Sequence, residues 1–323
     1  MHRRRLLLAT AGALALTALR AHAQPAFPTK ALRIVVPFAA GGVGDLTARA
    51  VATGLAERLG QPVVIDNRPG AGGVVAADAV ARAEPDGHTL FLMSNGTAVS
   101  ASLFRSLPYD TLADFAPVST LGFFDIAVLV PADSPHATLA QLLAHARARP
   151  GQLNIGSINI GSTQHLAAEL FKSSAAIDAQ VVPFNGTPAL ITALRGRQVD
   201  VGVEILGPTL PQVRAGALRV LAVTGEQRSA VLPDVPTAVE LGVQGFVATS
   251  WNALAAPART PRLVVERLQR EVVATVATPA VQQQLRALNV EPRTSTPGQA
   301  AALLKTDIER WRAVIERAGI PRQ

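Results

Sequence analysis

Apolar residues along the chain alternate between short continuous runs and stretches with helical spacing. Residues 32–36 form an apolar run that predicts a buried strand, and residues 45–59 carry apolar side chains at helical spacing. Further strands are predicted at 62–65 and 89–93, with a second helix between them. Strands that alternate with helices through short glycine-rich turns are typical of an α/β fold with a mainly parallel sheet.

The same alternation returns in the second half of the chain. Thr-Pro pairs begin at positions 187, 260 and 296, and each predicts a helix start, because Thr caps helices and Pro is tolerated in the first turn. The last of these helices carries an apolar stripe that includes Trp311, so we expect Trp311 in the core rather than at a ligand. Strands are predicted at 153–156, 180–183, 199–203 and 218–223, with a helix over 163–171.

The chain contains no sequence repeat and no low-complexity linker, although its length suggests two domains. We therefore expect two lobes joined by strands that cross between them, with candidate crossings at 124–130 and 250–256. Such a hinge lets rigid lobes close on a ligand held in the cleft between them. The predicted first lobe comprises residues 24–125 and 251–323, and the second comprises residues 126–250.

The first 23 residues have the three parts of a secretory signal peptide. Three consecutive arginines precede an apolar stretch at 6–19, and Ala21-His22-Ala23 forms a cleavage site. The apolar stretch is shorter than the roughly 20 residues that span a bilayer. We expect export to the periplasm and cleavage after Ala23, by either the general secretory or the twin-arginine route.

Composition and charge exclude several classes of protein. The net charge is +7, but the predicted signal peptide carries four arginines and no acid, so the mature charge is 7 − 4 = +3. This small excess, without a basic run interleaved with aromatics, gives no reason to expect a nucleic-acid partner. The chain has no cysteine, which excludes a disulfide scaffold, a Cys-ligated metal and a Cys nucleophile.

Catalytic and metal-binding templates are not matched. The segment around Ser94 lacks the first glycine of a nucleophile elbow, and none of the three lysines follows a glycine as a phosphate-binding loop requires. The four histidines outside the signal peptide have no partner at metal-ligand spacing. We therefore predict no enzyme activity, no cofactor and no metal.

Two polar, glycine-rich loops remain as candidates for ligand binding. Residues 37–45 connect a strand to a helix, and residues 154–165 cluster hydroxyl and amide side chains ahead of another helix. In open α/β sheets, ligands bind beyond the strand C-termini, where helix N-termini favour anions. Ordinary turn formation and Ser/Thr capping are the alternative readings of both loops, and packing or capping is the alternative for His165.

A series of short motifs runs along the mature chain, namely Val36-Pro37-Phe38 with Gly41-Gly42 and Asp45, Asn67-Arg68-Pro69-Gly70-Ala71-Gly72-Gly73, Leu107-Pro108-Tyr109-Asp110, Asp114-Phe115-Ala116-Pro117-Val118, Gly161-Ser162-Thr163-Gln164-His165-Leu166, Val182-Pro183-Phe184, Gln198-Val199-Asp200, Leu232-Pro233-Asp234-Val235-Pro236-Thr237 and Ser250-Trp251. Together they resemble the motifs of the substrate-binding proteins of tripartite tricarboxylate transporters, also called the Bug family. The resemblance covers nearly all of the mature chain. It implies a periplasmic Venus-flytrap protein that captures a small carboxylate and delivers it to a two-subunit membrane permease. The ligand classes to expect are monocarboxylates, dicarboxylates, acidic amino acids and aromatic acids, and we expect a monomer.

The resemblance also implies a set of site residues. A ligand carboxylate would be held by backbone N–H groups and waters of the two loops, without a buried arginine. The first lobe would contribute Phe38, Ala39, Ala40, Gly41, Gly42, Asp45, Ser94, Asn95 and Thr97. The second lobe would contribute Ser157, Gly161, Ser162, Thr163 and His165, with Phe184, Asn185, Gly186 and Thr187 as the far wall.

The sequence departs from the family pattern in three places. Glu204 stands where the family often has Asp, so a longer carboxylate would shrink the pocket and, if it faces the cleft, favour a ligand amine or hydroxyl. Asn252-Ala253 follows Trp251 where Tyr-Gly is usual, which removes an aromatic from the expected cleft mouth. Ala39-Ala40 replaces a segment in which Pro is common, so the first loop is expected to be less rigid.

Two alternatives to transport stay open. The same closed, ligand-bound form would serve a sensor that signals to a membrane receptor, and neighbouring genes would distinguish the two. An enzyme using the same cleft is less favoured, because no nucleophile–base pair is identifiable. For Arg68 we favour anchoring of its own turn over ligand contact, because Pro69 and the following glycines mark a tight turn.

Overall fold

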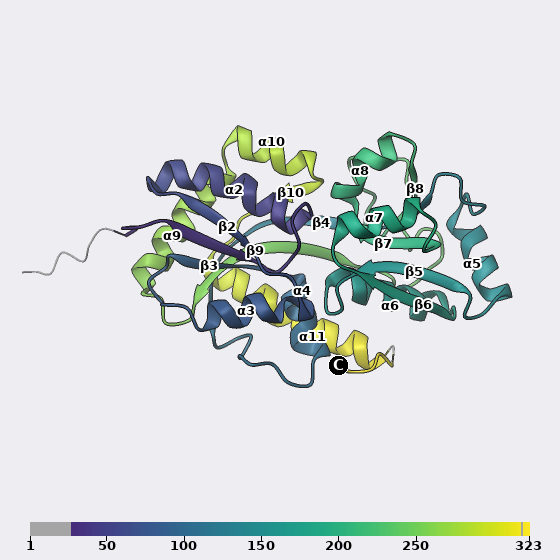
Figure 1. Cartoon of the computed structure of the whole chain (residues 1–323), viewed down its shortest axis with the longest axis horizontal. Coiled ribbons are helices and arrows are strands. Elements are labelled where there is room, and N and C mark those ends of the chain that lie inside the picture. Colours follow the sequence, from purple (N-terminus) through teal and green to yellow (C-terminus); the bar gives the residue numbers. More distant parts are fainter. Residues whose placement is uncertain (1–26, 318) are drawn as a thin grey trace, which may run out of the picture.

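The computed structural model describes residues 27–317 and 319–323, so the signal peptide predicted at 1–23 lies outside the described residues. The chain folds into two lobes that lie side by side along the long axis of the molecule (Figure 1). Each lobe is a β-sheet with helices on both faces, which confirms the two-lobed α/β class.

The sheet of the first lobe has a parallel centre. Strand β1 (Leu32–Val36) pairs in parallel with β2 (Val63–Asn67) and with β3 (Thr89–Ser94). Strand β9 (Thr249–Pro257) then runs antiparallel between β3 and the long strand β4 (Phe115–Pro131), and the short β10 (Val290–Pro292) pairs antiparallel with β4. β1 matches its predicted bounds, because its run of buried apolar residues is bounded by polar and turn-forming positions.

The second sheet is built the same way. β5 (Leu153–Ile158) pairs in parallel with β6 (Ala179–Phe184) and β7 (Val201–Ile205). The end of β4 closes this sheet by antiparallel pairing with β7 and with β8 (Leu218–Val223). Both sheets are therefore mixed rather than mainly parallel, because β9 and β10 run against the other strands of the first sheet and β4 runs against those of the second.

Strand β4 belongs to both sheets. Its residues 115–125 pair with β9 in the first sheet, and its residues 126–131 pair with β7 and β8 in the second. The crossing expected at 124–130 is therefore present. β9 pairs only with strands of the first sheet, so the return crossing lies just before it, where Ala248 N–H donates to Thr224 O at 2.8 Å. The lobe boundaries at residues 125 and 250 stay a prediction.

Helices cover both faces of each sheet (Figure 1). In the first lobe, α2 packs with α9 and α10 on one side, and α11 packs with α4 on the other. In the second lobe, α6 packs against β5, β6 and β7, and α7 contacts β5 and β7. Their bounds are α2 Val43–Leu59, η1 Ala71–Gly73, α3 Val74–Ala81, α4 Asn95–Leu103, α5 Leu139–Ala148, α6 Thr163–Ala175, α7 Thr187–Arg195, α8 Leu206–Arg214, α9 Arg262–Val276, α10 Pro279–Ala287 and α11 Pro297–Arg317.

Helix starts differ by one residue from two of the sequence predictions. The N-cap of α7 is Gly186, with a φ of 93°, so Thr187 already lies inside the helix instead of capping it. The N-cap of α9 is Pro261 rather than Thr260. Helix α4 was not predicted. Ser94 caps it by a capping box with Thr97, so these residues serve helix formation.

The core contains the side chains that the apolar pattern placed there. Trp311 is completely buried, and its Nε1 donates to Asn95 Oδ1 at 2.8 Å, which confirms that it is a core residue. Arg68 donates through Nε to Asp66 Oδ2 at 2.9 Å, and its backbone N–H donates to Val36 O, as an anchor of its own turn would. Among the described helices, none combines the length and apolarity needed to cross a membrane.

Candidate functional site

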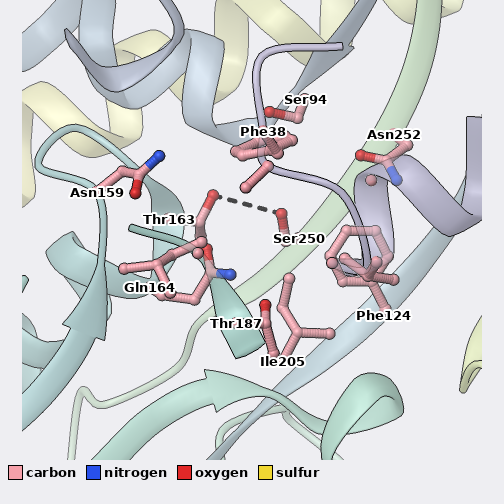
Figure 2. Close-up of a pocket in the computed structure, with 16 residues that line it drawn as sticks. Phe38, Ser94, Phe124, Asn159, Thr163, Gln164, Thr187, Ile205, Ser250 and Asn252 are labelled. Carbon is pink, nitrogen blue, oxygen red and sulfur yellow. Dashed lines mark hydrogen bonds between the residues drawn. The ribbon is translucent and has the colours of Figure 1, made fainter. Parts of the chain in front are cut away.

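A pocket lies between the two lobes, at the carboxyl ends of strands from both sheets (Figure 2). Its cavity volume is only about 20 Å³. The lobes are thus close together around a narrow site. Its lining residues are Phe38, Ala39, Gly42, Val43, Gly44, Ser94, Phe124, Ile158, Asn159, Thr163, Gln164, Gly186, Thr187, Ile205, Ser250 and Asn252.

Two helix N-termini without side-chain caps meet at this pocket. Helix α2 begins after Gly42 and helix α7 begins after Gly186, and neither N-cap supplies a hydrogen bond from its side chain. A Cβ at Gly42 would lie 3.4 Å from Thr187 Oγ1, so the two helix starts are in close contact across the lobes. Uncapped first-turn N–H groups carry partial positive charge and bind anions.

Helix α6 contributes a third N-terminus, and this one is capped. Ser162 Oγ accepts a hydrogen bond from His165 N at 3.0 Å, so Ser162 serves the helix. The next residue, Thr163, points into the pocket and reaches the other lobe. Its hydroxyl donates to Asn95 Oδ1 at 3.1 Å and lies 3.3 Å from Ser250 Oγ, the contact drawn as a dashed line in Figure 2.

Behind Thr163, buried hydrogen bonds connect the pocket wall to the last helix. Asn95 Nδ2 donates to Asp307 Oδ2 at 2.7 Å, and Trp251 Nε1 donates to the same oxygen at 2.6 Å. Trp311 Nε1 donates to Asn95 Oδ1. All four side chains are buried, so Asn95 acts as a junction between lobes rather than as part of the pocket lining.

Asp45 does not line the pocket, but its hydrogen bonds hold the first loop in place. Its carboxylate accepts hydrogen bonds from Gly41 N–H at 2.9 Å, from Arg49 Nε at 3.0 Å and from Asn67 Nδ2 at 3.0 Å. Burial alone would raise the pKa of Asp45, but these hydrogen bonds together hold it below its ordinary value. The loop containing Ala39-Ala40, expected to lack rigidity, is therefore braced at its base.

Glu204 is completely buried and is not in the pocket lining. Its Oε1 accepts from Gln164 Nε2 at 2.8 Å and from Ile205 N–H at 2.6 Å. Its Oε2 has no hydrogen-bond partner among the described residues. Burial raises the pKa of Glu204 to about 7, although the hydrogen bonds from Gln164 and Ile205 N–H, and the nearby Thr187 hydroxyl, favour the charged form. Any influence of Glu204 on a ligand passes through Gln164 and Thr187, which do line the pocket.

Two further candidates, His165 and Gly161, lie at the edge of the site. His165 is buried and its Nδ1 has no partner among the described residues; burial lowers its pKa, which favours the neutral ring. Gly161 approaches the first lobe so closely that a Cβ there would lie 2.9 Å from Gly72 Cα. Ser100 Oγ spans this contact, with 2.7 Å to Gly72 O and 3.2 Å to Gly161 O. These contacts hold the lobes together beside the pocket.

The structure thus gathers only part of the predicted site in the pocket lining. The predicted residues that line it are Phe38, Ala39, Gly42, Ser94, Thr163, Gly186 and Thr187. Ala40, Gly41 and Asn185 are exposed outside the lining. Asp45, Asn95, Thr97, Ser157, Gly161, Ser162, His165, Phe184 and Glu204 also lie outside it and belong to its supporting structure or its surroundings.

Sequence reasoning missed most of the pocket floor. Asn159 and Gln164 belong to the second loop singled out above, but were not chosen within it. Ile158 lies in the same loop, and Val43 and Gly44 lie in the first loop, but they were not chosen either. The lining residues outside both loops that were missed are Phe124, Ile205, Ser250 and Asn252. Position 252, expected at the cleft mouth, does line the interlobe pocket, but Asn252 is completely buried on β9 and therefore lies deeper than expected. The sequence did contain a usable pattern. Ser250 and Asn252 are two residues apart on a predicted crossing strand, so their polar side chains lie on the same face of it.

A larger and more open hollow lies at the junction of the lobes. Its cavity volume is about 660 Å³. Its lining comes from residues 123–125, 225–231 and 286–293, with Thr249. Arginines and acids are mixed along it, and burial raises the pKa of Asp125. It offers no uniform charge to a ligand. No group of three or more potential metal ligands occurs in the described residues.

A narrow interlobe pocket with uncapped helix N-termini, and without a charged side chain among its described lining residues, is the arrangement of a two-lobed ligand-binding protein. The profile described as the tripartite tricarboxylate transporter family receptor (TctC) matches residues 47–320. The chain belongs to this family. The protein BugT of Bordetella pertussis is 35% identical over 295 residues, which cover 91% of this chain and 90% of BugT.

Solved structures share the fold over nearly their whole length. A protein of R. palustris with adipate is 34% identical, with a TM-score of 0.88, over 91% of this chain and 99% of that one. MatC from Rhodopseudomonas palustris with bound malate is 33% identical, with a TM-score of 0.85, over 90% of this chain and 100% of MatC. These likenesses bear out the family resemblance seen in the sequence motifs.

Proposed function

We propose that the protein captures a small carboxylate between its lobes in the periplasm and delivers it to the membrane permease of a tripartite tricarboxylate-type transporter. The observation that carries the proposal is the meeting of the uncapped N-termini of α2 and α7 at a pocket whose described lining includes no charged side chain. Helix N-termini of this kind are suited to an anionic group and need no arginine to neutralise it.

Closure of the lobes would strengthen this recognition. The N-terminus of α2 belongs to the first lobe and that of α7 to the second, so a carboxylate between them contacts both lobes at once. Closure also excludes water, and each N–H to oxygen attraction grows stronger when the local dielectric falls. Ligand binding and the interlobe hydrogen bonds of Thr163 then favour the same closed arrangement.

The relatives support the class of ligand. The R. palustris structure holds adipate and MatC holds malate, and both ligands are carboxylates. In this chain the space is narrow and the described lining is largely apolar or neutral, with Phe38, Phe124, Ile158 and Ile205 beside small polar groups. We expect a small acid with one ionised carboxylate at the helix N-termini. Phe38, Gly42, Thr163, Gly186 and Thr187 are the predicted site residues that we assign to this binding.

A thermal-shift screen against small carboxylates tests the proposal. The panel contains mono- and dicarboxylates, acidic amino acids and aromatic acids, each beside its uncharged amide. A ligand at 100 times its dissociation constant adds about 2.7 kcal/mol of stability, which shifts the midpoint by about 2–4 °C in a chain of this size. We expect a selective shift with an acid and none with the corresponding fully amidated compound. Equal shifts with acid and amide would contradict recognition of an anion.

Delivery to a permease needs its own experiment. The protein and the two permease subunits of a tripartite tricarboxylate-type transporter from the same genome are produced together in a host that lacks them, and uptake of the labelled ligand is measured. We expect uptake only when all three are present. Binding without any effect on uptake, together with a neighbouring receptor gene, would instead favour the sensor function. Detection of the chain in the periplasmic fraction, with its N-terminus at residue 24, tests export and cleavage.

A further inference from the structure

Asn252 carries a polar group that the protein itself does not satisfy. The side chain lines the interlobe pocket and is completely buried. Neither its Oδ1 nor its Nδ2 has a hydrogen-bond partner among the described residues. A buried polar atom without a partner loses its hydrogen bonds to water and gains none in return, so native structures rarely keep two such atoms on one side chain.

The surroundings of Asn252 explain why its amide stays unpaired. β9 places it between Ser94 of β3 and Gly122 of β4, in the middle of the sheet. The Ser94 hydroxyl is used in capping α4, where it accepts from Gly96 N–H. Gly122 offers no side chain. Figure 2 shows Asn252 beside Phe124 on one wall of the pocket, across from Asn159 and Gln164.

The pairing requirements of the amide define the partner. A carboxamide presents one acceptor and one donor side by side, so its full complement is a group that donates and accepts at once. A carboxylate only accepts and an ammonium only donates, so each would leave one atom of Asn252 unpaired. The described lining also has no charged side chain that would neutralise an ion here. This requirement holds whichever way the amide is turned, because both of its atoms are unpaired.

We propose that Asn252 is a specificity-determining residue, and that the ligand carries, besides its carboxylate, a neutral group that both donates and accepts hydrogen bonds, as a carboxamide does. The inference rests on the proposed function, since it assumes that the carboxylate occupies the helix N-termini. It goes further by naming the chemistry of a second group on the ligand. A site built to pair a polar group discriminates strongly against analogues that lack it.

The test compares acids of equal size that differ only at the far end. Succinamate, succinate and 4-methylpentanoate form one set, and glutaramate, glutarate and 5-methylhexanoate form another that is one carbon longer. Dissociation constants are measured by titration calorimetry with the unaltered exported protein and with Asn252→Leu, which keeps the size and removes both polar atoms. We expect one of the two amides to bind the unaltered protein at least tenfold more tightly than its two counterparts. In Asn252→Leu, the apolar acid should bind at least as tightly as the amide.

A matched control tests whether the change in ligand preference is specific to Asn252 or follows from removing any buried, unpaired polar atom. Thr275 is completely buried on α9, outside the pocket lining, and its Oγ1 also has no partner among the described residues. Thr275→Val should leave the order of ligands unchanged. Without ligand, Asn252→Leu should raise the unfolding temperature, because an unsatisfied amide is replaced by an apolar group of similar shape. A lower unfolding temperature would indicate a structural role and would overturn the inference.

The outcomes distinguish this inference from the function on which it rests. If the unaltered protein prefers a dicarboxylate or an apolar acid, or if Asn252→Leu keeps the preference for the amide, the inference is wrong and carboxylate binding stands. The inference is also wrong, and carboxylate binding also stands, if neither set of acids binds while other acids of the screening panel do. If no carboxylate of any kind binds, the proposed function itself fails.

Discussion

The hydroxyl of Thr163 in the second lobe donates a hydrogen bond to Oδ1 of Asn95 in the first, over 3.1 Å. The same oxygen accepts from Trp311, and the other end of the Asn95 amide donates to Asp307. Thr163, which lines the pocket, therefore connects the contact between the lobes directly to the packing of α4 and α11. The geometry of this contact makes it a test of how much closure contributes to ligand affinity.

Replacing Thr163 by Val keeps the shape of the side chain and removes its bonds to Asn95 and Ser250. Each bond contributes about 0.5–1.5 kcal/mol, so we expect affinity for the best carboxylate to fall about tenfold. Calorimetric titration measures this. Thr192→Val is the control, because the exposed Thr192 hydroxyl bonds only to Pro188 O in its own helix. Affinities of the two variants within twofold of each other would contradict the role given to Thr163.

Glu204→Gln should remove a pH dependence of stability. The ordinary pKa of the Glu204 carboxyl is 4.5, and burial raises it to about 7 in the folded chain. Between these values the folded state holds a proton that the unfolded state releases, so the free energy of unfolding falls as pH rises, by about 1.4 kcal/mol per pH unit. The fall ends above pH 7. Urea unfolding between pH 5 and 8 should show a shallower slope in the Gln variant. An unchanged slope would mean that another group is responsible.

The same carboxyl should couple ligand affinity to pH. The Thr187 hydroxyl lines the pocket and favours the charged form of Glu204. An anion bound near Thr187 competes for this hydroxyl and repels a second negative charge, so it favours the protonated form of Glu204. Carboxylate affinity is then expected to be higher at pH 6 than at pH 8, where the buried charge opposes the ligand. Calorimetry at the two pH values measures the ratio. In Glu204→Gln the ratio should approach one, and a ratio that stays unchanged would count against this coupling.

Asp45→Ala should loosen the first loop without removing a pocket residue. The substitution deletes the acceptor for Gly41 N–H, Arg49 and Asn67, and we expect a loss of about 2 kcal/mol of stability together with weaker binding. Thermal unfolding and calorimetry measure the two effects. Asp78→Ala offers a matched comparison, because Asp78 forms an exposed pair with Arg82 four residues on. If the two variants behave alike, the loop does not depend on Asp45.

Gly207→Ala should hinder closure without straining the backbone. A Cβ at Gly207, at the start of α8, would lie 1.6 Å from Leu288 O in the first lobe, so the lobes must separate to accommodate it. We expect every ligand to bind at least tenfold more weakly, with the ranking of ligand affinities unchanged. Small-angle scattering with ligand present should give a larger radius of gyration than the unaltered protein has. Gly298→Ala, in open space at the start of α11, is the control. Normal affinity in Gly207→Ala would show that this contact is not needed for closure.

Much of the fold could be predicted because the first lobe and the core follow local rules. β1 and the last helix were located by runs and stripes of apolar residues, and the buried Trp311 followed from helical spacing. The mixed character of both sheets could not be read this way. It arises from the pairing of β4 and β9, which lie far apart in sequence, and periodicity carries no information on strand direction.

The candidate site was predicted less completely, for a related reason. Loops rich in glycine and serine pointed to Gly42 and Thr163, because free helix N-termini have a local signature. The floor of the pocket instead consists of strand residues such as Phe124 and Asn252, whose position depends on how the lobes meet. Asn95 and Asp45 were chosen as ligand contacts, yet their hydrogen bonds are used to hold other residues. Short polar side chains look alike in sequence whether they support a pocket or line it.

Strand β4 has a consequence for how the molecule folds. Because residues 115–125 complete one sheet and residues 126–131 complete the other, unfolding of either lobe removes an interior strand partner from its neighbour. The two lobes share one continuous run of backbone hydrogen bonds along this strand. Heat or denaturant should therefore melt both in a single cooperative transition, as if the chain were one domain in thermodynamic terms.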